Sequence, residues 1–147
     1  MNRLPILLTL AVVLLVGSGL GALLLFTNLS NEPAPAHLLV NPASVDLGDI
    51  PQDGGIVSST VTIKNDGGLP LEIFRLSTSC GCTTADMDAS PLAPGDERTL
   101  TIRFNPMTHP DESGPITRVV YVQTSDPTQP EMEINVTGVV IPITERL

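Results

Sequence analysis

Aromatic residues are scarce in this 147-residue chain, which has no tryptophan, one tyrosine and three phenylalanines. Hydrophobic residues still make up 41% of the sequence, so a core has to be built mainly from valine, isoleucine and leucine. β-Branched side chains favour strands over helices. Fourteen prolines and twelve glycines interrupt the chain and leave short apolar runs between them. The composition therefore predicts an all-β domain.

Positive charge is also scarce. Seven lysines and arginines stand against sixteen acidic residues, which gives a net charge of -9, and Lys64 is the single lysine. Phosphate binding requires a basic patch, and the sequence contains none. Nucleic acid is therefore excluded as a partner. The acidic residues are scattered along the chain, so we interpret them as a feature that keeps the protein soluble.

Residues that carry catalysis are few. The chain has two histidines, His37 and His109, and neither a Gly-x-Ser-x-Gly segment nor a phosphate-binding glycine loop. A cysteine nucleophile paired with His109 would lack a third group to orient the base. The sequence therefore predicts a protein that is not an enzyme and that has no resident cofactor.

One long apolar run lies at the amino end. Residues 4–26 form 23 almost uninterrupted apolar positions, preceded by Arg3. This length spans a bilayer as a helix, whereas the apolar part of a signal peptide is usually about 7–15 residues. Ala34-Pro35-Ala36 resembles a cleavage site but lies well beyond the run. We predict a retained single-pass anchor over residues 1–27 in the cytoplasmic membrane, with the remainder on the periplasmic or cell-surface side.

A polar, proline-containing linker over residues 28–36 precedes the domain expected over residues 37–147. Apolar and polar residues alternate in short segments there, with turn signals every 8–12 residues. This pattern predicts a seven-stranded immunoglobulin-like β-sandwich. The seven expected segments are 37–41 and 44–50, which are the two halves of a proline-broken edge strand, and 56–65, 71–79, 97–104, 116–124 and 132–140.

Both cysteines lie in the short segment Cys80-Gly81-Cys82, where an expected strand runs into a loop. Residues i and i+2 of an extended chain point to the same side, and Gly81 allows the segment to bend. Three states are open to such a pair. It can chelate a soft metal, close into a small disulfide, or remain a redox-active dithiol.

The topology of a seven-stranded sandwich places further candidate ligands near this pair. The loops 51–55, 79–82 and 105–115 are expected at one end, which brings Met107 and His109 to the cysteines, with Met87 also near. We therefore predict Cys80, Cys82, Met107 and His109 as a metal-ligand set, with copper(I) as the alternative cofactor. The linker joins the opposite end, so the loops 66–68 and 125–130 should face the membrane, and both sulfurs should be reachable from solvent.

Five segments in order resemble a known family. The sequence is similar to bacterial Ig-like domains of unknown function that carry a Ser-Cys-Gly-Cys-Thr motif, and these are similar to ASH-type and HYDIN-type Ig-like domains. The resemblance covers roughly residues 37–141. It rests on Pro70-Leu71-Glu72-Ile73, Ser79-Cys80-Gly81-Cys82-Thr83, Pro91-Leu92-Ala93-Pro94-Gly95, Phe104-Asn105-Pro106 and Thr124-Ser125-Asp126-Pro127. It implies the Ig-like fold and export or membrane tethering, and it implies no reaction.

Two functions are compatible with these features. The first is a membrane-anchored, extracytoplasmic Ig-like module that acts as an interaction or structural subunit and has a protein partner. The alternative is an exported copper(I)-binding or thiol-redox protein that uses the Cys80-Gly81-Cys82 segment.

Overall fold

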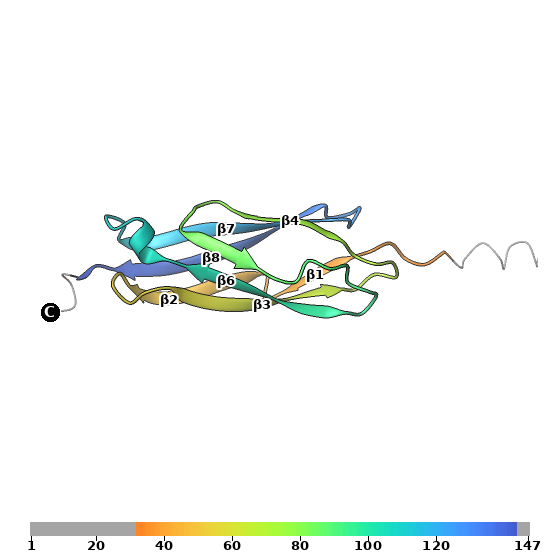
Figure 1. Ribbon diagram of the computed structural model, residues 1–147, viewed down its shortest axis with the longest axis horizontal. Helices are drawn as coiled ribbons and strands as arrows, with labels where there is room; N and C mark the ends of the chain where they lie inside the picture. The colour runs from red at the N-terminus through yellow and green to blue at the C-terminus, as the bar shows by residue number, and fades with distance from the viewer. Residues whose placement is uncertain (1–31, 144–147) are drawn as a thin grey trace, which may run out of the picture. The chain divides into compact units, whose positions relative to one another are not determined.

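The computed structural model describes residues 32–143, and they form a β-sandwich of two four-stranded sheets (Figure 1). The sandwich belongs to one compact unit that begins at Ala34, close to the predicted start at residue 37. The first sheet has the order β1 (Leu38–Asn41), β3 (Val57–Asn65), β6 (Glu97–Phe104) and β5 (Thr83–Asp86). The second has the order β2 (Ser44–Pro51), β8 (Glu131–Ile141), β7 (Gly114–Thr124) and β4 (Ile73–Thr78).

The all-β prediction is confirmed, but the count of seven strands is wrong, because the described residues contain eight. The expected first strand divides at Pro42. Its two halves lie in different sheets, since β1 pairs antiparallel with β3 whereas β2 pairs parallel with β8. The eighth strand is β5, which has four residues, pairs with β6 and was not revealed by the sequence pattern.

The predicted transmembrane helix covers residues 1–27 and lies outside the described residues. Within residues 32–143, no helix has the length and the apolar character needed to cross a membrane.

Alternating apolar residues of the two sheets pack against one another between the sheets and form the core, as predicted. Phe104, Val120 and Ile134 have no exposed surface. Burying a side chain of this size contributes about 1.5–3 kcal/mol relative to leaving it exposed. Other fully or almost fully buried side chains from the predicted inward positions are Val61, Ile63, Leu100, Ile102, Val122 and Val136.

The irregular pattern predicted for the 71–79 segment is also found. The register between β4 and β7 shifts between Ile73 and Arg75, which is a β-bulge or a similar irregularity. Phe74 consequently points outward and is 63% exposed, while Ile73 is buried. Strand β7 lies between β4 and β8, as predicted for a central strand.

The loops gather at two opposite ends of the sandwich, and the chain enters at one of them (Figure 1). At the entry end, the Asp66 amide donates to His37 O at 2.8 Å and the Gly68 amide donates to Ala34 O at 3.1 Å. Gly67 is required there, since a Cβ atom would lie 2.5 Å from the His37 nitrogen. At the other end, the short 3-10 helix η2 (Pro106–Thr108) lies in the loop between β6 and β7.

Candidate functional site

The Cys80-Gly81-Cys82 segment crosses from β4 in one sheet to β5 in the other, and backbone contacts fix its course. The Thr83 amide donates to Cys80 O at 3.1 Å, and the Asn105 amide donates to Cys82 O at 2.8 Å. The Thr78 hydroxyl lies 3.0 Å from Cys80 O and 2.9 Å from Thr83 O. None of these four hydrogen bonds involves a sulfur atom.

The two sulfurs are joined as a disulfide, with an S–S distance of 2.07 Å. Of the three states left open by the sequence, the structure therefore contains the local disulfide. A metal site or a free dithiol at this position requires reduction first, because the thiolate is the metal ligand and the nucleophile.

The two cysteines differ in exposure. Cys82 is 2% exposed and lies in a small cluster with Phe104 and Ile116 at this end of the core, whereas Cys80 is half-buried. The prediction that both sulfurs are reachable from solvent is therefore wrong for Cys82. Its side chain packs as a small apolar group in this cluster.

His109 reaches this site from the loop after η2, as the topology predicted. Its Nε2 atom lies 3.4 Å from Cys80 Sγ. The sulfurs of Cys80 and Cys82 and a ring nitrogen of His109 lie within 4.8 Å of one another. After reduction, this set could converge on one metal ion.

The two methionines that we expected near the cysteines lie in different environments. Met107 lies on η2 and is 50% exposed, so its role as a ligand stays a prediction. Met87, which we expected near the cysteines, packs against the larger core cluster. Met87 directly follows β5, and its flexible thioether side chain packs against apolar neighbours there.

Arg118 is a site residue that we did not predict. Its Nε donates to Cys82 Sγ at 3.2 Å, and one of its terminal nitrogens contacts the Glu112 carboxylate. The side chain is only 15% exposed. The sequence did contain a signal, because Arg118 lies at even spacing with the inward Ile116 and Val120 of β7. A charged residue at an inward position needs a partner, and here the partners are Glu112 and the sulfur of Cys82.

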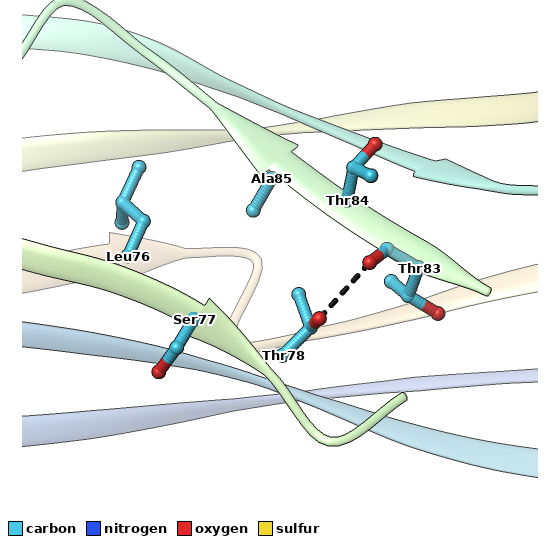
Figure 2. Close-up of a pocket in the computed structure, with 6 residues that line it drawn as sticks. All are labelled: Leu76, Ser77, Thr78, Thr83, Thr84 and Ala85. Atoms are coloured by element: carbon cyan, nitrogen blue, oxygen red, sulfur yellow. Dashed lines mark hydrogen bonds between the residues drawn. The ribbon is translucent and has the colours of Figure 1, made fainter. Parts of the chain in front are cut away.

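A cavity of about 220 Å³ opens beside the disulfide segment, between β4 and β5 (Figure 2). Both strands end their sheets, so each has one edge without a strand partner among residues 32–143. The hydrogen bond from the Thr78 hydroxyl to Thr83 O closes the cavity at the disulfide side. The residues that line it are Leu76, Ser77, Thr78, Thr83, Thr84 and Ala85.

Asp126 organises the opposite end of the sandwich. The residue is 1% exposed, and its carboxylate accepts hydrogen bonds from the Leu38 amide at 2.8 Å and the Thr128 hydroxyl at 2.7 Å. His37 Nδ1 lies 3.0 Å away. Burial raises the pKa of this carboxyl, but the hydrogen bonds from Leu38, Thr128 and Gln129 outweigh burial and hold the pKa well below its usual range. Asp126 therefore fixes the end at which the chain enters.

Several solved structures share this fold. A protein of unknown function from Porphyromonas gingivalis W83 is 23% identical, with a TM-score of 0.65, and the match covers 76% of this chain and 51% of that one. The ASH/PapD-like domain 7 of human CEP192 is 13% identical, with a TM-score of 0.57, covering 78% and 92%. The Vibrio cholerae protease VesB is 14% identical, with a TM-score of 0.51, covering 70% and 31%. These similarities concern the fold alone.

The chain spans about half the length of the Porphyromonas protein. Among curated proteins, none matches the sequence. A family described as "Protein of unknown function (DUF1573)" matches residues 38–140, from the first residue of β1 to the next-to-last residue of β8. The match includes the disulfide, Arg118 and His109 together with every strand of the sandwich, and the chain therefore belongs to this family of Ig-like domains.

Proposed function

We propose that this protein is a membrane-anchored, extracytoplasmic interaction module that binds an extended segment of a partner protein between β4 and β5. The observation that supports this proposal is the cavity between these strands, with an unpaired strand edge on each side. The protein acts by binding and not by catalysis.

Such a site favours an extended polypeptide segment as its ligand. An unpaired edge presents a row of N–H and C=O groups to which another strand can add. Alternate side chains of an added strand point to one face, so one of them can enter the cavity. The lining residues Ser77, Thr78 and Thr84 offer hydroxyl groups, while Leu76 and Ala85 offer apolar contact.

The membrane anchor and the extracytoplasmic location rest on the apolar run of residues 4–26. The position of the site is compatible with that arrangement. The chain enters the sandwich next to Asp66 and Asp126, whereas the disulfide segment lies at the opposite end (Figure 1). A domain tethered in this way would present the disulfide end away from the bilayer.

The copper(I) alternative has weaker support. Copper(I) favours thiolate ligands, and both sulfurs of the predicted set are joined to each other. The convergence of Cys80, Cys82 and His109 would support copper binding only in the reduced protein.

Site-specific photo-crosslinking in the cells that make the protein tests the interaction. A photoreactive amino acid replaces Thr84, an exposed residue of β5 that lines the cavity, in the full-length chain. The matched control replaces Thr60, an exposed residue of β3. We expect one discrete crosslinked product from position 84 and none from position 60.

A second substitution, Ser77→Arg, makes this test specific. An arginine at this position fills the cavity from the β4 side, so the product from position 84 should disappear. Equal crosslinking from positions 60 and 84, or a product that persists in the Ser77→Arg chain, would show that the proposed binding site is wrong.

A further inference from the structure

We propose that the Cys80–Cys82 disulfide oxidises external dithiols by exchange, with Cys80 as the attacked sulfur and Cys82 as the leaving thiolate held by Arg118. This activity goes beyond the interaction function and does not depend on it. One difference in exposure and two contacts support the proposal, and each assigns a separate role.

The exposure of the two sulfurs determines the direction of attack. Cys80 is half-buried, whereas Cys82 is 2% exposed and packs in the cluster at the end of the core. An incoming thiolate can therefore reach Cys80 Sγ but not Cys82 Sγ. Thiol–disulfide exchange proceeds through a mixed disulfide, and here the mixed disulfide has to form on Cys80.

Arg118 favours the reduced state of the pair. A disulfide sulfur is a weak, uncharged acceptor, yet the Nε of Arg118 points at Cys82 Sγ from 3.2 Å. The guanidinium is largely shielded from water, and its contact with Glu112 holds it in place. When the disulfide opens, Cys82 becomes a thiolate, and the same contact then joins the guanidinium to an acceptor of opposite charge, which strengthens it. A disulfide whose reduced form is stabilised in this way is oxidising.

His109 supplies the site for a proton. Its Nε2 lies 3.4 Å from Cys80 Sγ, and the imidazole is exposed to solvent. This position allows the ring to transfer a proton between the incoming thiol, Cys80 and water.

The exchange takes place in two successive thiolate attacks. The first thiol of the external dithiol loses its proton to His109 and attacks Cys80 Sγ. The Cys80–Cys82 bond breaks, and its electron pair leaves with Cys82 as a thiolate. The second thiol loses its proton to water and attacks the first substrate sulfur, which releases Cys80. His109 returns its proton to Cys80. The external dithiol becomes a disulfide, and the protein holds one thiol and one thiolate.

A purely structural disulfide fits the position poorly. A link between residues two positions apart constrains little of the unfolded chain. The crossover is already held by the hydrogen bonds of Thr78, Thr83 and Asn105. We therefore expect the sandwich to remain folded when the disulfide is reduced.

Equilibration of the purified full-length protein with dithiothreitol tests the role of Arg118. In the Arg118→Met variant, the equilibrium constant for reduction should fall by at least about tenfold, which corresponds to about 30 mV for this two-electron couple. Arg118→Lys keeps the charge and should recover most of the loss. The matched control is Arg75→Met, which removes an exposed arginine from β4 and should leave the constant unchanged. Equal constants in all four proteins would overturn the proposal.

A second measurement uses the wild-type protein and does not depend on the folding of a variant. The protein is treated with glutathione, quenched with acid, and digested so that the mixed disulfide can be located by mass spectrometry. The adduct is expected on Cys80. An adduct predominantly on Cys82 would overturn the assignment of the attacked sulfur, and absence of reduction at high dithiothreitol would overturn the activity itself.

Discussion

Phe104 gives the sharpest test of what stabilises the sandwich. Its side chain has no exposed surface and lies in the end cluster with Ile50, Cys82, Ile116 and Val140. Its backbone is paired on both sides, with Val57 of β3 and Thr83 of β5. Because both neighbouring strands are fixed, the structure cannot collapse around a smaller side chain. Phe104→Ala should therefore cost about 4–5 kcal/mol, the upper part of the usual range for this truncation.

Urea unfolding followed by circular dichroism measures this cost. Domains of this kind have a total stability of about 5–15 kcal/mol, so the loss is a large fraction of it. With a slope of about 2 kcal/mol per molar urea, the midpoint should fall by about 2 M. The matched control is Phe74→Ala. Phe74 is 63% exposed, so its truncation should change the free energy of unfolding by no more than about 0.5 kcal/mol.

Reduction of the disulfide provides the second comparison. The closed loop is so short that the chain-entropy estimate of its contribution is below about 2 kcal/mol. A free energy of unfolding for Phe104→Ala within about 1 kcal/mol of the wild-type value would refute the reasoning that places stability in the core and not in the sulfurs. Unfolding of the domain by reduction alone would refute it as well.

Two further predictions concern the entry end and the amino terminus. The pKa of Asp126 is lower in the folded protein than its value of about 3.9 in the unfolded chain, so the stability it contributes is present above about pH 4 and is lost as the pH falls further. Asp126→Asn should lower the free energy of unfolding by more than about 2 kcal/mol at pH 7. The variant should also lose less stability than the wild type between about pH 4 and pH 2. An unchanged pH dependence in urea titrations would contradict this. The intact mass of the protein purified from membranes should include residues 1–27, and a mature chain that starts near His37 would contradict the retained anchor.

The sequence predicted the regular strands well because large β-branched residues alternate in them. Strands β3, β6 and β8 carry an apolar residue at nearly every second position and lie where the period of two placed them. Strand β5 has no such pattern, since Ala85 is its one apolar residue. Its place depends on pairing with β6, which is a contact between distant parts of the chain. The same limit applies to β2, whose parallel pairing with β8 cannot be read from local alternation.

The candidate site was predictable in its location but not in its chemistry. The topology of the loops brought Cys80, Cys82 and His109 together as expected. The direction of each sulfur depends on how the chain bends at Gly81, and the sequence leaves that bend open. Arg118 could have been identified by its even spacing with Ile116 and Val120 on β7. Its contact with Cys82 could not, because that contact joins β7 to the distant crossover segment between β4 and β5.

We propose that a membrane-anchored sandwich presents its disulfide end to the extracytoplasmic side. Labelling of Cys80 by a membrane-impermeant maleimide, after mild reduction of sealed right-side-out membrane vesicles, tests this claim most directly. We predict that Cys80 is labelled without permeabilising the vesicles and that Cys82 reacts far more slowly, because it is 2% exposed. Labelling of Cys80 that appears only after the vesicles are permeabilised would place the domain on the other side of the membrane and contradict the account.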